Sequence, residues 1–423
     1  MLAAIVPGRC RHLALPPGKD VFLSPNALSG TSALCADMRR MSAAAVLVIA
    51  VLASGCDAPE RKPTSEPPPS SAAASPKPRN SLTVVAAGDL LVHPALTEQA
   101  AADARRAGRD GHDFTQVLAA VRARVSAADL AICHMETPLA EPTGPFTGWP
   151  NFSVPPALAD AAAWAGFDTC STASNHSLDT GVEGIARTLD NLDRVGLRHT
   201  GTARTAAESQ RPNVMDVGGV KIGQLSYTLS FNDIPLPPGR PWAANLIDAD
   251  AILAEARRAR VAGAEIVILS MHWGTEYQNE PNADQVDLAI RLLSSPDIDL
   301  IVGHHAHVVQ PFEKVGAKWV AYGMGNLTTR FGDGSAENTQ DAVVPEFTFT
   351  RTPSGGWEVT GVTVLPTWME YRPRARVVDL TAALSDPVVP APRRAHYAAI
   401  ARRINGYVDL RDAFSAGLRM PHQ

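Results

Sequence analysis

The chain has 423 residues, of which 45% are hydrophobic and 19% are charged, so it can bury one large core or two smaller ones. Its formal net charge is −5 and its isoelectric point is near 6.2. These values exclude a broad basic surface, and we therefore expect no nucleic-acid partner.

The N-terminal segment predicts export. Residues 1–37 lack the pattern of a signal peptide, and we interpret them as an extension that results from a misassigned start codon. Residues 38–55 are typical of a signal peptide, because two arginines precede an apolar run that is too short to span a bilayer.

Small residues before Cys56 resemble a lipobox, although Ala53 stands where such boxes more often carry Leu. This pattern predicts cleavage before Cys56, lipid attachment to its thiol, and a membrane-anchored lipoprotein at the cell envelope. The alternative is a plain secretory signal with an incidental cysteine. The following segment, residues 56–80, is rich in Pro, Ser and Ala, and predicts a tether without a core of its own.

Short apolar runs alternate with amphipathic segments after Leu82, which indicates an α/β domain over residues 81–370. The runs that predict strands are 82–89, 129–136, 166–176, 265–274 and 299–307, and the segments that predict helices include 114–127, 181–195, 249–262 and 283–293. Nearly continuous Val, Ile and Leu are typical of a sheet that is buried on both faces.

The remaining elements predict mixed sheets. Residues 214–227 indicate an antiparallel hairpin, and 318–327, 346–352 and 357–366 indicate further strands, the last two joined by a Pro-Ser-Gly-Gly turn. Residues 371–423 contain two segments with helical periodicity, and we expect a helical tail that packs on the domain.

Two cysteines, Cys133 and Cys170, lie in this predicted domain. An exported domain could join them in a disulfide. Each also ends an apolar run, where a small buried thiol fits equally well, and the sequence does not favour pairing over two free thiols.

Potential metal ligands follow five of the predicted strands. They are Asp89, Glu136, Asn175 with His176, His272, and the group from His304 to His307. Taken singly, each has an ordinary explanation as a turn, a helix cap or a buried histidine. Because active sites of open α/β sheets gather at the carboxyl ends of the strands, we expect these groups to converge. Their oxygen and imidazole character suits manganese, iron or zinc.

The order of these motifs resembles the CapA family of poly-gamma-glutamate synthesis proteins. The residues that carry the resemblance are Gly88-Asp89, Met135-Glu136-Thr137-Pro138, Asn175-His176-x-x-Asp179, His272-Trp273-Gly274-x-Glu276-Tyr277, Gly303-His304-x-x-His307 and Tyr322-x-x-Gly325-Asn326. This chain departs from the family pattern at His134, where an Asn is usual, at Ser174 and at Ala306.

The resemblance implies a calcineurin-like metallophosphoesterase-type fold, with α/β/β/α layers around a centre of two divalent metal ions. It implies that the ligands are Asp89, Glu136, Asn175, His272, His304 and His307, with His176 as the general acid. A metallophosphoesterase carries a His two residues after its first Asp, whereas His93 follows Asp89 by four, which leaves ligation by His93 open. His134 could add a ligand or replace a supporting hydrogen bond.

The chemistry of such a centre can be stated from the residue types. A bridging carboxylate such as Asp89 can hold two cations about 3.5–4 Å apart, and that pair activates water for attack on a phosphoryl or acyl group. His176 could protonate the leaving oxygen. Asp179 could orient His176 or cap the following helix, and we favour the cap.

Other residues near these motifs have two open interpretations. Trp273 and Tyr277 could wall a substrate cleft, with Glu276 as a polar contact, or pack beneath the loop. Asn326 could support a ligand or form a turn. We expect His305 to be a spare imidazole that points elsewhere or supports a ligand.

Three functions remain open. The first is an envelope-anchored protein that helps to make, export or attach an anionic capsular polymer such as poly-gamma-glutamate, together with other capsule synthesis proteins. The second is a general metal-dependent phosphodiesterase or phosphatase, a hydrolase that acts on phosphoesters. The third is a non-catalytic lipoprotein that binds the polymer.

Overall fold

The computed structural model describes residues 79–331 and 335–421. The predicted extension, the signal peptide, the lipidation site Cys56 and nearly all of the predicted tether lie outside these residues. Within the described part of the chain, no helix combines the length and the apolar character needed to cross a membrane.

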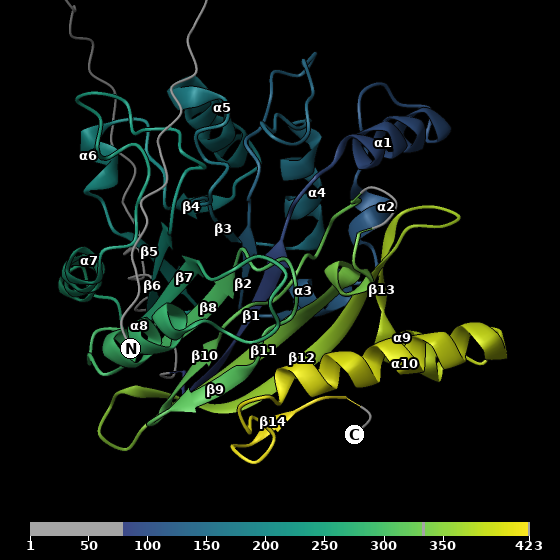
Figure 1. Cartoon of the computed structure of the whole chain (residues 1–423). Helices are drawn as coiled ribbons and strands as arrows, with labels where there is room; N and C mark the ends of the chain where they lie inside the picture. Colours follow the sequence, from purple (N-terminus) through teal and green to yellow (C-terminus); the bar gives the residue numbers. More distant parts are fainter. Residues whose placement is uncertain (1–78, 332–334, 422–423) are drawn as a thin grey trace, which may run out of the picture. The chain divides into compact units, whose positions relative to one another are not determined.

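Among the described residues, the larger of two sheets has eight strands, in the order β13-β12-β11-β1-β2-β3-β4, with β14 beside β12. Figure 1 shows β1, β11 and β12 side by side in this sheet. Strands β1 to β4 run parallel, whereas β11, β12 and β13 pair antiparallel. The bounds are β1 Ser81–Asp89, β2 Leu130–His134, β3 Thr169–Ser171, β4 Arg198–Thr200, β11 Asp341–Arg351, β12 Trp357–Glu370, β13 Arg376–Asp379 and β14 Leu418–Arg419.

The smaller sheet has six strands in the order β5-β6-β7-β8-β10-β9. The central strands β6, β7, β8 and β10 run parallel, and the two outer pairs, β5 with β6 and β9 with β10, are antiparallel hairpins. The bounds are β5 Asn213–Val217, β6 Val220–Thr228, β7 Ile266–His272, β8 Leu300–His304, β9 Phe312–Val315 and β10 Lys318–Ala321. Both sheets are mixed, as the sequence predicts.

Helices occupy the outer layers of the fold. Their bounds are α1 Pro94–Arg106, α2 Thr115–Leu118, α3 Arg122–Ala127, α4 Ala157–Ala165, α5 Gly181–Arg194, α6 Ala206–Ser209, α7 Ala249–Val261, α8 Ala283–Leu293, α9 Leu380–Ser385 and α10 Ala391–Val408. The single helix predicted over 114–127 is wrong, because the chain forms a turn between α2 and α3.

In the described part of the chain, three apolar clusters separate these layers. One lies between the sheets, where Val84 and Ile132 of the larger sheet share a core with Ile268 and Val302 of the smaller. A second packs α1 to α5 against the other face of the larger sheet, and a third packs α7 and α8 against the smaller one. The predicted α/β/β/α layering is therefore confirmed, and the alternation of side chains along each strand explains it.

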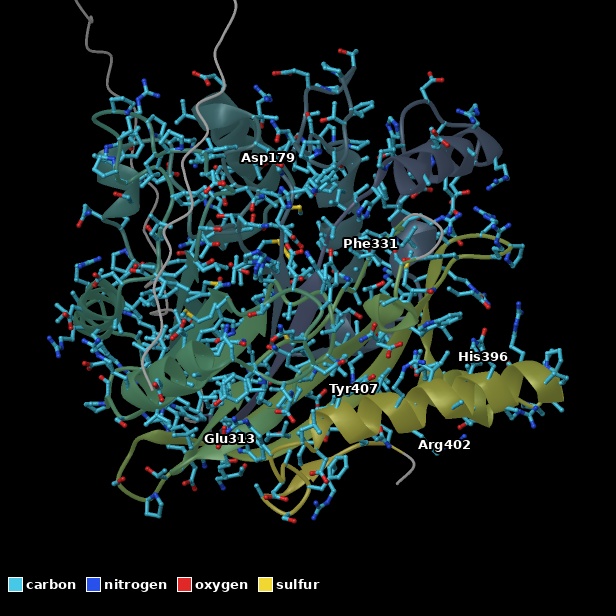
Figure 2. The ribbon with its side chains drawn as sticks, in the orientation of Figure 1. Asp179, Glu313, Phe331, His396, Arg402 and Tyr407 are labelled. Carbon is cyan, nitrogen blue, oxygen red and sulfur yellow. A yellow bond between two sulfur atoms is a disulfide. The ribbon has the colours of Figure 1, made fainter. Side chains whose placement is uncertain are left out.

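The C-terminal segment contributes strands as well as helices. The first of the two helices predicted within residues 371–423 covers residues 374–384, and it is wrong in its first half, because β13 pairs with β12 there. Helix α10 buries Tyr397, Ile400, Ile404 and Val408 in the core between the sheets, with a spacing of three or four residues that places them on one face. Figure 2 shows Arg402 and Tyr407 along this helix.

Candidate metal centre

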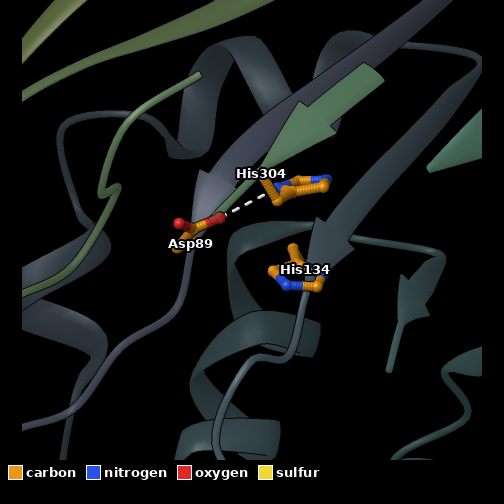
Figure 3. A group of neighbouring side chains, drawn as sticks. All are labelled: Asp89, His134 and His304. Carbon is orange, nitrogen blue, oxygen red and sulfur yellow. Dashed lines mark hydrogen bonds and ion pairs between the residues drawn. The ribbon is translucent and has the colours of Figure 1, made fainter. Parts of the chain in front are cut away.

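The carboxyl ends of the parallel strands bring the predicted ligands together. Asp89 of β1 is in register with His134 of β2, and His272 of β7 with His304 of β8. The two sheets meet at this end, where the Nδ1 atom of His304 lies 2.9 Å from Asp89 Oδ1 (Figure 3). The predicted convergence of distant strand ends is therefore observed.

Two glycines allow the strand ends to lie close to the loop after β10. A Cβ atom on Gly88 would lie 2.0 Å from the carbonyl oxygen of Gly325, and one on Gly303 would lie 1.8 Å from that of Tyr322. The backbone N–H of Asp89 donates to the Gly325 carbonyl, at 2.9 Å. These close contacts fix the positions of Asp89 and His304.

Asp89, Glu136 and His307 form one group of potential ligands, and all three are buried. The Nδ1 atom of His307 lies 3.4 Å from Asp89 Oδ2, and its Nε2 atom lies 3.7 Å from Glu136 Oε1. Neither carboxylate oxygen of Glu136 has a hydrogen-bond partner among the described residues. Because buried polar atoms are nearly always partnered, this carboxylate suits a cation.

A second group of potential ligands comprises Asp89, His134 and His304. The Nε2 atom of His304 is buried and has no hydrogen-bond partner in the described part of the chain. The rings of His134 and His304 stack with their centroids 3.9 Å apart. Asp89 belongs to both groups. A carboxylate that bridges two cations would have this position.

Asn175 and His272 lie beside the second group. Asn175 Oδ1 is 2.9 Å from His272 Nε2, and the Asn175 amide donates to Asn232 Oδ1 at 3.2 Å. The second contact turns the amide oxygen of Asn175 toward His272. The amide is neutral, so it can face an anionic substrate without repelling it.

The electrostatics of the centre follow from burial and close charges. Burial raises the pKa of Glu136 well above its usual value. Burial would also raise the pKa of Asp89, but contacts with His304 and His307 outweigh it and lower the pKa. Burial lowers the pKa of His307, but Glu136 and Asp89 outweigh this effect and raise it to about 9. A cation would replace the proton that His307 holds at neutral pH.

His176 and Asp179 form a buried pair at the edge of the centre. Asp179 Oδ2 accepts from His176 Nδ1 and from the backbone N–H of Phe152, both at 2.7 Å. Thr180, rather than Asp179, is the N-cap of α5, so the favoured cap interpretation is wrong. Asp179 instead fixes the orientation of the His176 ring, which also packs edge-on against Phe152.

His305 and Asn326 both support the predicted ligands. His305 has a positive φ of 84°, and its Nδ1 atom lies 3.1 Å from His272 Nε2. It therefore faces the centre, which agrees with the interpretation that His305 supports a ligand and not with the alternative that it points elsewhere. Asn326 Oδ1 lies 2.9 Å from His307 Nδ1, and its amide donates to the His307 carbonyl at 3.0 Å.

The other predicted residues lie farther out. Trp273 is buried and donates from Nε1 to the Tyr322 carbonyl at 2.9 Å, so it packs beneath the loop. Tyr277 is 49% exposed, with its ring centroid 6.0 Å from that of His307, which suits a cleft wall. Glu276 is exposed. His93 packs against Phe152 and Phe331 and belongs to neither ligand group.

Several contacting residues were missed from the sequence. Each of these residues forms a hydrogen bond with a predicted site residue: Ser171 with His134, Phe152 with Asp179, and Asn232 with Asn175. None of the three lies in a motif that would identify it from the sequence. Ser171 ends β3, so its position at a strand end was the available signal. Cys133 and Cys170 form a disulfide between β2 and β3, which resolves the open question of their pairing.

The chain that carries this centre matches a known protein family. Residues 83–330 match the family described as bacterial capsule synthesis protein PGA_cap. The chain belongs to this family. The match covers more than half of the chain and includes every predicted ligand, and it confirms the resemblance to CapA.

Relatives of the PGA_cap family carry names from capsule synthesis. The chain is 30% identical over 209 residues to the PGA biosynthesis protein CapA of Bacillus subtilis, covering 47% of this chain and 51% of that protein. It is 27% identical over 183 residues to the capsule biosynthesis protein CapA of Bacillus anthracis, covering 43% of this chain and 44% of that protein. The matched region spans about half the length of these relatives.

Solved structures with a similar arrangement include phosphoesterases. The calcineurin-like phosphoesterase YfkN of Bacillus subtilis is 13% identical with a TM-score of 0.41, covering 78% of this chain and 97% of that one. A putative 5′-nucleotidase of Staphylococcus aureus is 15% identical with a TM-score of 0.44, covering 79% of this chain and 62% of that one.

Proposed function

We propose that this PGA_cap protein acts on an anionic capsular polymer such as poly-gamma-glutamate, through a centre of two divalent cations. The observation that carries the proposal is the sharing of Asp89 between two buried groups of potential ligands. The names of the CapA relatives support the polymer as the partner class. Other capsule synthesis proteins are the expected protein partners.

The residues divide into two sets around Asp89. Glu136 and His307 would hold one cation, and Asn175, His272 and His304 would hold the other. Manganese, iron and zinc suit these oxygen and imidazole ligands. Bound cations would supply Lewis acidity and a water of lowered pKa for attack on a phosphoryl or acyl group.

His176 would act as the proton donor to the leaving group, which is the amide nitrogen if poly-gamma-glutamate is cleaved and an oxygen if a phosphoester is. Its Nδ1 atom is held by Asp179 at 2.7 Å, which leaves Nε2 as the atom that can face substrate. A His176→Ala variant should therefore lose turnover while it keeps its metal content. Loss of metal in this variant would instead make His176 a ligand.

We also propose that the protein is anchored at the cell envelope through lipid on Cys56. Supporting features are the export signal before this cysteine and the Pro/Ser/Ala-rich segment after it. Mass spectrometry of the membrane fraction tests this, because Cys56→Ser should lose the lipid mass and leave the membrane. An unmodified Cys56 in membrane-bound protein would contradict the anchor.

The substrate can be tested on purified protein that begins after Cys56. Cleavage or transfer of poly-gamma-glutamate, followed by chain length, should depend on added metal and fail in Asp89→Ala. Turnover of bis-p-nitrophenyl phosphate without any action on the polymer would favour a general phosphodiesterase. Polymer binding without turnover of either compound would favour a non-catalytic binding protein.

A further inference from the structure

A chain of buried hydrogen bonds leads from β3 to the candidate metal centre. Ser171 Oγ lies 2.8 Å from His134 Nδ1, and His134 Nε2 lies 3.0 Å from His272 Nδ1. All three side chains are buried. The chain ends at His272, whose Nε2 lies 2.9 Å from Asn175 Oδ1 and 3.1 Å from His305 Nδ1, so it ends beside the predicted ligand Asn175.

His134 has a neighbour at each ring nitrogen. A neutral imidazole carries one N–H and one lone pair, and both are used if His134 donates to Ser171 and accepts from His272. The Ser171 hydroxyl can then donate to the Cys133 carbonyl, 3.3 Å away. Every proton in this arrangement has an acceptor, and no lone pair of His134 remains for a cation.

If His134 donates to Ser171 and accepts from His272, one nitrogen of His272 is left free for a cation. If His272 Nδ1 carries the proton that His134 accepts, the lone pair lies on Nε2, the atom that faces Asn175. Partners of this kind set the tautomer and the ring orientation of metal-binding histidines. His134 thus differs from the other members of its ligand group, because its ring nitrogens face Ser171 and His272.

We propose that His134 is a positioning residue, which accepts the Nδ1–H of His272 and donates to Ser171, and so presents His272 Nε2 to a divalent cation. This inference rests on the proposed metal centre. It assigns His134 a role in orienting the ligand His272, without direct contact between His134 and the cation. The roles of His134 and His304 therefore differ, although their rings stack: His304 would bind the cation and His134 would not.

The first test compares metal affinities by chelator competition. His134→Leu removes the acceptor at similar volume and should weaken zinc binding about 10-fold to 100-fold. His134→Gln places an amide oxygen near the position of Nε2, and should recover most of this loss. His112→Leu is the matched control, because His112 packs against Phe146 outside the centre, and it should bind zinc as the wild type does.

The second test identifies the coordinating nitrogens directly. Protein loaded with ¹¹³Cd and labelled with ¹⁵N should show coupling from cadmium to His272 Nε2 and none to either nitrogen of His134. Thermal unfolding of the metal-free variants separates a loss of affinity from a loss of folding, because the affinities are compared only between folded proteins.

The outcomes distinguish the two proposals. Coupling from cadmium to His134, or wild-type affinity in His134→Leu, would overturn the positioning role and leave the metal centre intact. Equal losses in His134→Leu and His134→Gln would also overturn it, because Gln keeps the acceptor. A wild-type protein that binds no ion would overturn the proposed function together with this inference.

Discussion

Asp89 is the residue on which both groups of ligands depend. Its two carboxylate oxygens face different histidines, Oδ1 toward His304 at 2.9 Å and Oδ2 toward His307 at 3.4 Å. The sequence could predict Asp89 as a ligand because it follows a buried strand. It could not show that His134 contacts His272 at 3.0 Å, because that contact crosses from one sheet to the other.

The protonation of His307 predicts how metal binding depends on pH. Burial lowers its pKa, but Glu136 and Asp89 raise it to about 9. Below this pH a proton competes with the cation, so affinity should rise from neutral pH upward, by up to about tenfold per unit for one proton, and then level off. Chelator competition across this range measures the effect, and an affinity that does not change with pH would contradict it.

The close approach at Gly88 predicts a second residue-scale effect. Gly88→Ala would place a Cβ 2.0 Å from the Gly325 carbonyl oxygen, so Asp89 and the loop that carries Asn326 must separate. We expect weaker metal binding and a lower free energy of unfolding, measured by chelator competition and urea denaturation.

Gly406→Ala is the control for that substitution. A Cβ on Gly406 would meet nothing within 4 Å, and Ala favours the helix by up to about 1 kcal/mol. Its metal affinity should equal that of the wild type. Equal behaviour of the two variants would show that the contact at Gly88 is unimportant.

Strands β2 and β3 are the elements that hold His134 and Ser171 in place. The pair Cys133–Cys170 and the pair His134–Ser171 are consecutive in their register. The sequence predicted both strands, because continuous apolar runs mark strands that are buried on both faces. It could not predict β13, because that strand forms by pairing with β12 and its short sequence also fits a helix.

The disulfide predicts an element-scale effect on stability. It joins residues 37 positions apart, with Cα atoms 4.4 Å from one another. The double variant Cys133→Ala/Cys170→Ala should lower the free energy of unfolding by about 2–4 kcal/mol, mainly because its unfolded chain is less restricted. Urea denaturation measures this. Wild-type protein that unfolds identically with and without reductant would contradict it.

At the scale of the whole molecule, α10 completes the core between the sheets. The sequence indicated a helix here and placed it as a tail on the domain, and four of its residues are buried in that core. Arg403 of α10 also forms a bidentate ion pair with buried Asp341, at 2.7 and 2.8 Å. The extent of this packing depends on contacts between distant segments, which local periodicity does not reveal.

The packing of α10 predicts a clear contrast between two of its residues. Ile404→Ala should lower the free energy of unfolding by about 2–5 kcal/mol, because Ile404 is fully buried and the substitution leaves a cavity. Arg402→Ala, at an exposed position of the same helix, should change it by no more than about 0.5 kcal/mol. Similar values for both variants, from urea denaturation, would contradict the placement of α10.

The metal content of the purified protein tests the shared centre most directly. Elemental analysis of protein that begins after Cys56 should find about two divalent ions per chain. Asp89→Ala should retain almost none, because both groups lose their common ligand, whereas His304→Ala should retain the ion at Glu136 and His307. A stoichiometry unchanged in both variants, with His112→Ala as the control, would contradict the proposed centre.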